Sequence, residues 1–298
     1  MTLLDALAAQ FPNAKRSTLR AMIREGRVTV GGVVAVSAKL EVPDAQTVRV
    51  SRHPARRVGR PGPHRPFDIL HEDADLIVID KPHGLMTQSG ARDRRPTLVG
   101  LLNDFLVRRD GERSRARLVH RLDADAAGVI VFSRNNAAHA SLKRQFADHS
   151  AGRVYLALVD GVPRPPSGQI ASRLVELADG RVRSTKRTDR GEPAVTHYEV
   201  LRSGGAGQPS LVRAQLQTGR KHQIRVHLSE RGWPILNDRL YHPRPGDGWL
   251  CLVAVELSLE HPRTGKRVVY RRPAPAWVGA DKIAAGGLPG LRGESPAR

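Results

Sequence analysis

Residues 118–132, LVHRLDADAAGVIVF, decide how the rest of the chain is interpreted. The apolar run Val129–Phe132 is typical of a buried strand, and Gly128 marks the point where that strand starts. Asp123 therefore lies at the entrance of a predicted strand, two residues after Arg121. A lone Arg-Leu-Asp sequence is more often a solvated turn with a chance ion pair than a functional site. The interpretation of Asp123 thus depends on the other segments of the chain.

Two further segments carry residues with chemical potential. Residues 153–159, RVYLALV, place a tyrosine inside an apolar strand pattern, and residues 218–228, TGRKHQIRVHL, form a dense basic segment. Together with residues 118–132 and the segment 72–85, EDADLIVIDKPHGL, they resemble the motifs of the RluA-type pseudouridine synthases, in the order of that family. The resemblance covers about residues 67 to 275.

The region 67–275 alternates short apolar runs, typical of strands, with few helical patterns. Strands are predicted at residues 76–79, 129–132, 154–159, 196–201, 211–216, 250–257 and 267–270. Helices are predicted at residues 97–107, 137–147 and 222–230, and Asn135 or Asn136 is expected to cap the second of them. Because these helices are too few for repeated strand–helix–strand units, we expect an α+β fold with a mixed, largely antiparallel sheet and a few packed helices.

Residues 1–52 are predicted to form a separate small α/β domain. Leucines at helical spacing predict a first helix, a second helix follows a predicted N-cap at Ser17, and Gly31-Gly32 joins two valine-rich strands. Five cations lie in or beside the second helix: Lys15, Arg16, Arg20, Arg24 and Arg27. With Glu25 as the opposing charge nearby, they favour an RNA-binding face over a merely solvated one.

This small domain also resembles the RNA-binding domain of a small-subunit ribosomal protein, which often precedes the catalytic domain of this synthase family. Residues 53–66, where arginines alternate with prolines, are predicted to be a basic linker. Residues 67–275 then form the predicted catalytic domain. Residues 285–298, at the C-terminal end, are predicted to be a flexible tail.

The composition indicates a polyanionic partner. The chain of 298 residues has 49 Lys and Arg against 29 Asp and Glu, a net charge of +20. Each phosphate that such a protein neutralises releases counterions and adds affinity. An anionic membrane would require a basic helix with bulky apolar residues opposite, and no such helix is evident. We therefore predict that structured RNA is the partner, that no membrane is bound, and that the protein is a monomer.

The cysteine count and the length of the apolar runs exclude several classes of site and of protein. Cys251 is the single cysteine, which excludes an internal disulfide and a zinc site built from several cysteines. No apolar run approaches the ~18 residues of a membrane span. The first residues lack the basic region of a secretory signal, so we expect a cytoplasmic protein.

The family resemblance implies three catalytic residues: Asp123, Tyr155 and Arg225. Converting uridine to pseudouridine breaks the bond from ribose to N1 and remakes it to C5, with no net redox change and no group lost. The family's chemistry therefore implies neither a metal nor an organic cofactor. An ionised Asp123 could act as a nucleophile or as a base at the sugar. The resemblance places Arg225 beside Asp123, where a guanidinium would keep the carboxylate ionised. It also places Tyr155 against the target base, where it would stack and help to remove the C5 proton.

The motifs also supply predicted substrate-binding residues: Lys81, His120, Arg121, Arg220 and His222. Lys81 is expected either to shape the cleft or to contact a phosphate. The sequence departs from the family at Ala126-Ala127, where the family usually has Thr-Ser. Two hydroxyl groups that could hydrogen-bond the loop are therefore missing, which raises the question of what holds this loop. A milder departure is Arg153, where lysine is more common.

Two other functions fit parts of the sequence. A metal-dependent nuclease would suit a basic chain but needs several acidic residues or paired histidines on one face. His222 and His227 are five residues apart, so a helix would direct them apart. A non-catalytic RNA-binding factor on a decayed synthase scaffold is motivated by the two alanines, and the joint presence of the three predicted catalytic residues opposes it. Ribosomal RNA is the first predicted substrate and transfer RNA the second.

Overall fold

The computed structural model describes residues 1–24, 27–30, 33–34, 38, 40, 42, 48–50, 66–89, 95–205 and 207–278. The chain divides into two compact units, Met1–His64 and Arg65–Arg298, and each is described here by itself. Most of the predicted linker (53–65), the predicted tail and the predicted Gly31-Gly32 turn lie outside the described residues.

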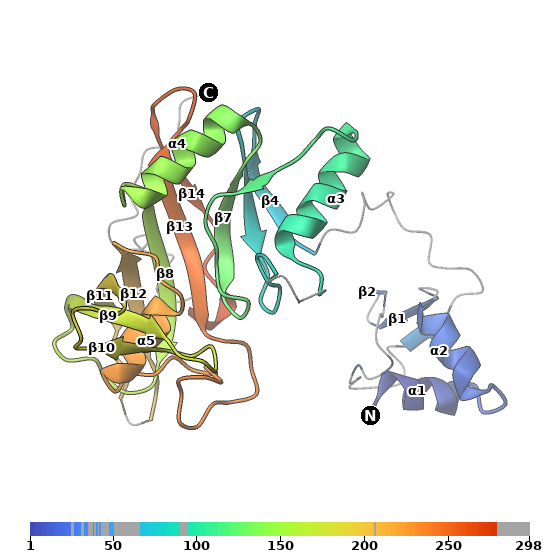
Figure 1. The fold of residues 1–298 in the computed structure, drawn as a ribbon. Coiled ribbons are helices and arrows are strands. Elements are labelled where there is room, and N and C mark those ends of the chain that lie inside the picture. The colour runs from blue at the N-terminus through green and yellow to red at the C-terminus, as the bar shows by residue number, and fades with distance from the viewer. Residues whose placement is uncertain are drawn as a thin grey trace. The chain divides into compact units, whose positions relative to one another are not determined.

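The N-terminal unit packs two helices on a small sheet (Figure 1). Its elements are α1 (Leu3–Gln10), α2 (Arg16–Arg24), β1 (Val28–Val30), β2 (Val33–Val34) and β3 (Val48–Val50). The strands are antiparallel in the order β2-β1-β3. Leucine and valine side chains from α1, α2 and the sheet fill its core. The predicted N-cap of the second helix is wrong, because α2 begins at Arg16 and Ser17 lies within its first turn.

The second unit is built on one large sheet. The strands along it follow the order β10-β9-β11-β12-β8-β13-β7-β5-β4, while β6 pairs with β7 and β14 pairs with β13. Their bounds are β4 (Asp68–Glu72), β5 (Leu76–Lys81), β6 (Arg117–Leu118), β7 (Ala127–Ser133), β8 (Gly152–Val159), β9 (Ser167–Glu176), β10 (Val182–Thr185), β11 (Glu192–Arg202), β12 (Ser210–Leu216), β13 (Leu252–Glu260) and β14 (Arg267–Arg271). All neighbouring pairs are antiparallel except β7 and β13, which confirms the predicted mixed, largely antiparallel sheet.

Three helices and a short 3-10 turn accompany this sheet: α3 (Leu98–Asp110), α4 (Asn136–Ala147), α5 (Gln223–Glu230) and η2 (Ala276–Val278). Thr97 caps α3 by accepting a hydrogen bond from the Gly100 N–H (3.2 Å). Asn135, a predicted cap, accepts from the Ala138 N–H (2.8 Å) at the start of α4. Of the helices in the described part of the chain, none is long and apolar enough to cross a membrane.

The parallel contact between β7 and β13 explains why Gly128 opens its strand. Gly128 pairs with Ala254 and has φ +122°, a conformation that favours glycine. A Cβ atom at this position would lie 2.1 Å from the Ala254 carbonyl oxygen, so any side chain would force the two strands apart. The loop that carries Asp123 thus enters β7 where the two backbones leave no room for a side chain.

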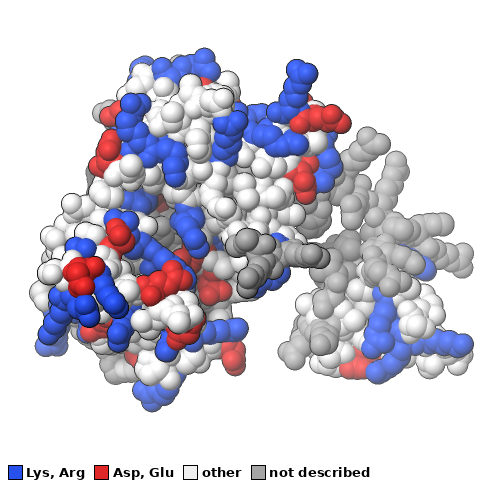
Figure 2. Space-filling view, in the orientation of Figure 1, with Lys and Arg blue, Asp and Glu red and all other residues white. Residues whose placement is uncertain are grey.

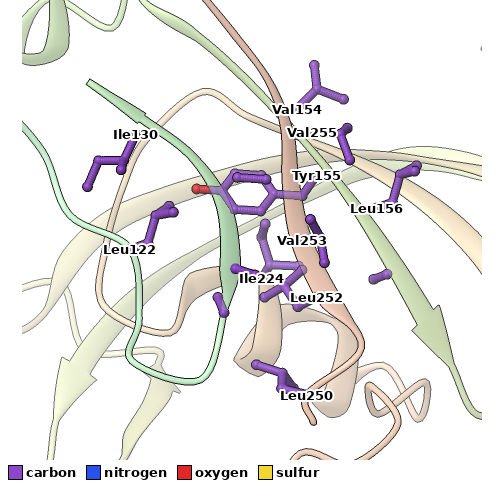
Figure 3. Close-up of a cluster of buried hydrophobic side chains, with 14 of the residues drawn as sticks. Leu122, Ile130, Val154, Tyr155, Leu156, Ile224, Leu250, Leu252, Val253 and Val255 are labelled. Atoms are coloured by element: carbon purple, nitrogen blue, oxygen red, sulfur yellow. The ribbon is translucent and has the colours of Figure 1, made fainter. Parts of the chain in front are cut away.

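The buried core brings distant motifs together (Figure 3). Leu122 and Ile224 both belong to the largest buried apolar cluster, with Tyr155 from β8 and Leu252 from β13. Leu122 directly precedes Asp123, and Ile224 directly precedes Arg225. Burial of these apolar side chains therefore fixes the positions of Asp123 and Arg225, which are 102 residues apart in the sequence.

Candidate active site

A pocket of about 420 Å³ collects most of the predicted site residues. Its wall comes from the loop before β7, from β8, from the end of α4 and from the start of α5. The predicted residues that line it are His120, Arg121, Asp123, Tyr155, Arg220, His222 and Arg225. Lys81 is the one predicted residue of the catalytic domain that does not line it.

Arg225, which lines this pocket, contacts two carboxylates. Its side chain is only 2% exposed, and its Nη1 lies 3.5 Å from Asp123 Oδ2. Its Nε and Nη2 donate to both carboxylate oxygens of Asp238, at 2.8 and 2.7 Å. Burial alone would lower the pKa of Arg225, but Asp238 and Asp123 together raise it above its usual range. The guanidinium is therefore a fixed positive charge at neutral pH.

Asp238 is the functional residue that sequence reasoning missed. Its side chain is 0% exposed and also accepts hydrogen bonds from the N–H groups of Leu240 (3.0 Å) and Tyr241 (3.2 Å). Arg225 thus makes its two-pronged contact with Asp238. Asp123, which is 18% exposed, receives the remaining nitrogen and stays accessible from the pocket. A buried arginine requires a second acidic partner of this kind, because one partly exposed carboxylate cannot accept hydrogen bonds from all its N–H groups.

Tyr155 lies on β8 and contributes to the same wall. It is buried, and Figure 3 shows its ring among apolar side chains with the hydroxyl directed toward the side of Leu122 and Ile130. Burial raises the pKa of Tyr155 to about 12. The hydroxyl is therefore protonated at neutral pH, and the ring presents a flat apolar surface to the pocket.

His120 has a packing role in the structure. Its ring stacks on Phe146 of α4, with 4.3 Å between centroids and 15° between planes. Its Nε2 accepts a hydrogen bond from the Val131 N–H (3.2 Å). Burial, with the nearby charges of Arg153 and Lys143, lowers the pKa of His120 to about 3. A neutral His120 therefore holds the loop of Asp123 against β7 and α4.

Lys81 does not line the pocket, so of the two roles expected from the sequence the structure favours shaping the cleft over contact with a phosphate. Its side chain is fully buried at the end of β5, and its ammonium donates to the carbonyls of Pro82 (2.9 Å), Leu85 (2.8 Å) and Ala124 (3.0 Å). Burial lowers the pKa of Lys81 to about 8. Its three donors are all used, so Lys81 shapes the cleft by holding the loop of Asp123.

Two neighbours of Lys81 complete this support. Thr87 Oγ1 donates to the Leu122 carbonyl (2.7 Å) and accepts from the Leu122 N–H (3.2 Å). His83 Nδ1 donates to the Asp125 carbonyl (2.7 Å). Ala126 and Ala127, where the family usually has hydroxyl side chains, are buried in the main apolar cluster. The loop is thus held by side chains from the segment after β5 on one flank and by apolar packing on the other.

The polar residues at the start of α5 form the opposite rim. Arg220 Nε donates to the Pro193 carbonyl (3.1 Å), and its guanidinium lies 3.5 Å from Glu192. His222 shares a hydrogen bond with the Tyr241 hydroxyl (2.8 Å), and burial lowers the pKa of its imidazole. Arg121 is exposed at the pocket mouth. These side chains are available to an incoming polar ligand.

The structure gives little support to a metal-dependent nuclease. In the described part of the chain, one group of three residues could hold a metal ion: Asp73, Asp75 and His261. Asp75 already accepts hydrogen bonds from Arg263 (2.6 and 2.8 Å), and Asp73 is bonded to His261 (3.0 Å). The group lies before β5, whereas the loop of Asp123 is tied to Lys81 at the far end of that strand. At ~3.3 Å per residue, β5 separates the two by roughly 16 Å.

The predicted RNA-binding cations of the N-terminal unit, in and around α2, differ in exposure. Leu19 and Ile23 are buried, while Lys15, Arg16 and Arg20 are exposed. Arg16 is paired with Asp5 of α1 (2.8 Å), so Glu25 is not the only opposing charge. Arg27 is half-buried, and the side chain of Arg24 lies outside the description. Figure 2 shows Lys and Arg on the surface of both units, with Asp and Glu among them.

Comparisons with known proteins agree on one family. A family model of RNA pseudouridylate synthases matches residues 75–230, more than half of the chain. The chain is 34% identical over 288 residues to ribosomal large subunit pseudouridine synthase D of Pseudomonas aeruginosa, covering 91% of this chain and 88% of that protein. It is 38% identical over 217 residues to the uncharacterized RNA pseudouridine synthase YhcT of Bacillus subtilis, covering 70% and 69%.

A solved structure supports the same assignment. Human RNA pseudouridylate synthase domain containing 4 superposes with a TM-score of 0.59 and 26% sequence identity, covering 70% of this chain and 89% of that one. The match agrees with the large sheet and with the motifs gathered around its pocket. The chain belongs to the RNA pseudouridylate synthase family.

Proposed function

We propose that this protein converts specific uridines of structured RNA, ribosomal RNA first, into pseudouridine, with Asp123 as the essential carboxylate. Members of its family are isomerases, and several relatives are named for the large ribosomal subunit. The observation that carries the proposal is the ion pair between Asp123 and Arg225 in the wall of the pocket. Transfer RNA is the second candidate substrate.

The geometry around Asp123 suits a carboxylate that reacts while ionised. Arg225 offers it a permanent positive charge at 3.5 Å, and Asp238 keeps that guanidinium oriented. Because Asp123 has only one of the guanidinium nitrogens near it, its other oxygen is free to approach the ribose or the uracil. Attack as a nucleophile and removal of a proton from the sugar are both compatible with this arrangement.

We assign Tyr155 to holding the uracil by stacking. Its ring lies in the pocket wall among apolar side chains, where it can cover one face of a base. Its hydroxyl stays protonated well above neutral pH, since burial raises its pKa to about 12. Tyr155 would therefore have to lose its own proton before it could take one from C5, so stacking is the role that the structure favours.

Substrate RNA would enter over the basic rim of the pocket. We assign Arg121, Arg220 and His222 to contacts with the RNA there, and the exposed cations of α2 to phosphates further along a folded RNA. Isomerisation has no net redox change and loses no group, so the proposal includes no cofactor. We further propose that the protein acts in the cytoplasm as a monomer.

Mapping of pseudouridines by chemical probing and sequencing tests the proposal. Ribosomal and transfer RNA from cells that lack the protein are compared with RNA from cells that carry it. We expect a small set of ribosomal sites to disappear, and to return with the wild-type gene but not with Asp123→Asn. An unchanged map, or full restoration by Asp123→Asn, would contradict the proposal. Loss of sites in transfer RNA alone would replace the first substrate by the second.

A further inference from the structure

A second arginine in the pocket has no partner of opposite charge. Arg153 lies on β8 two residues before Tyr155, so both side chains are on the same face of the strand. It lines the pocket, yet its residue is only 8% exposed. Among the described residues no carboxylate pairs with it: its Nη2 donates to the Gln217 carbonyl (3.3 Å), and its Nε has no hydrogen-bond partner.

The surroundings of Arg153 are shaped to hold a guanidinium in one position. The guanidinium lies over the ring of Phe146, 5.6 Å from its centroid, and that ring stacks in turn on His120. Gly219 leaves the space for it, because a Cβ atom there would lie 2.3 Å from Arg153 Nη1. Packing against Phe146 and Gly219 therefore fixes the side chain without giving it a partner of opposite charge.

A buried charge without a partner lowers the stability of the fold, so we expect this charge to serve a function. Within the described part of the chain, no carboxylate is paired with Arg153. Among the described residues that line the pocket, Asp123 is the one carboxylate and is paired with Arg225, while Lys143 and His149, from α4 and the segment after it, are basic. Lys143 lies exposed on the same part of the pocket wall. The missing anion must therefore arrive with the ligand.

We propose that Arg153, with Lys143 at the rim, binds a backbone phosphate of the RNA next to the target uridine. This inference rests on the proposed function, in which the uracil lies against Tyr155. Arg153 points from the same strand face, two residues away, and a phosphodiester is the anion that a bound nucleotide carries at that range. A guanidinium meets phosphate oxygens through two parallel N–H groups, which gives the contact direction as well as strength.

A double-mutant cycle between protein and RNA tests this contact. A short synthetic stem-loop with the uridine found by mapping is made in versions that each carry one neutral methylphosphonate linkage. For the wild type, we expect one linkage beside the uridine to weaken binding about tenfold to a hundredfold, as for a charge-assisted hydrogen bond. Arg153→Met should weaken binding of the normal RNA similarly and abolish the effect of that linkage. Arg153→Lys should give an intermediate result.

A matched control is available on the neighbouring strand. Arg213 on β12 also has an unpartnered Nε, but it lies near Glu199 (4.0 Å) and does not line the pocket. Arg213→Met should leave the sensitivity to the neutral linkage intact. The melting temperature gives a second criterion, because removal of an unpaired buried charge should leave the free protein as stable as the wild type or more so.

Three outcomes would overturn the assignment. The first is a neutral linkage that weakens binding to Arg153→Met as much as to the wild type. The second is a melting temperature of Arg153→Met that falls together with affinity for every RNA, as for a purely structural arginine. The third is a loss of turnover without a loss of affinity, which would place Arg153 on the base or on Asp123. Because affinity is measured apart from turnover, RNA that binds without being modified would contradict the proposed function alone.

Discussion

Arg225 in the pocket is buried, whereas the described cations of α2 are exposed. We therefore expect the first to affect turnover and the second to affect the affinity for RNA. In the pocket, Arg225 is 2% exposed and shared by two carboxylates, so its position and charge are fixed. On α2, Lys15 and Arg20 extend into solvent, and the Arg16–Asp5 pair is exposed on both sides. Buried charges act strongly because little water screens them, whereas exposed charges are screened and add only small increments. We therefore expect substitutions in the two regions to affect different measurements.

The largest effect is expected from Asp123→Asn. The amide keeps the size of the side chain but removes the charge that the chemistry uses. Turnover should fall below detection while affinity for RNA stays within a few fold, since many other cations bind the RNA. Single-turnover formation of pseudouridine and a filter-binding titration measure the two quantities on the same RNA. Measurable turnover by the amide variant would remove Asp123 from the mechanism.

Arg225→Met should damage both turnover and stability. Without the guanidinium, Asp238 is left buried and unpaired, which costs about 3–5 kcal/mol in the free energy of unfolding. Adding Asp238→Leu should recover much of that stability, because buried ion pairs can often be replaced by apolar side chains. Turnover should not recover, because Asp123 still lacks its positive neighbour. Urea unfolding and turnover measured on both variants check this, and joint recovery of the two would mean that Arg225 only supports the fold.

Lys81→Met should have a smaller effect, through the loop alone. Three carbonyl groups lose their donor, which should lower stability by about 2–3 kcal/mol, and the loosened loop should reduce turnover about tenfold. RNA affinity should be unchanged, because Lys81 does not reach the pocket. If RNA affinity falls instead while the melting temperature holds, Lys81 contacts the substrate after all.

The pH dependence of Lys81 provides a further check on this prediction. Its folded pKa of about 8 is below that of a free lysine, so between about pH 8 and 10 the unfolded chain binds more protons than the folded one. The stability of the wild type relative to Lys81→Met should therefore rise with pH across that window and be flat below it. Wild-type turnover should decline above about pH 8, as the neutral amine can no longer donate to three carbonyls.

Local signals in the sequence predicted much of the fold. The cap at Asn135 and the apolar run 129–132 each specify their element within a few residues, and α4 and β7 form there. The strands β9 and β10 were missed. Their polar side chains lie on exposed positions near the edge of the sheet, so the apolar alternation that marks a strand is broken. Such strands are specified by pairing with their neighbours, β9 with β11 and β10 with β9, and a local pattern does not contain this information.

The site was predicted less completely, for a related reason. The family motifs identified Asp123, Tyr155 and Arg225, and all three line one pocket. Asp238 follows Asn237, which has φ +62°, in a segment without an apolar pattern, and only the tertiary path brings it to Arg225. In the sequence, Lys81 resembles any cation that precedes a proline. Its burial depends on three backbone carbonyls that the fold brings around its ammonium group.

The smallest effects are expected on α2, where they test the other half of the comparison. Replacing Lys15 and Arg20 with glutamine should flatten the log–log dependence of RNA affinity on salt by about 1.5, since each phosphate contact contributes roughly 0.7–0.9. Asp5→Asn should act in the opposite direction, because it frees Arg16 from its ion pair and removes a negative charge beside the helix. Turnover at saturating RNA should not change in either variant.

The matched control for this last experiment lies in the catalytic unit. Asp189 is also exposed and pairs with an arginine, Arg187, at 2.8 Å, but neither residue lines the pocket. If α2 contacts phosphates, Asp5→Asn should strengthen binding a few fold and Asp189→Asn should not. Equal gains from the two substitutions would mean that net charge alone sets the affinity. In that case the cations of α2 form an ordinary solvated face, and RNA recognition belongs to the pocket and its rim.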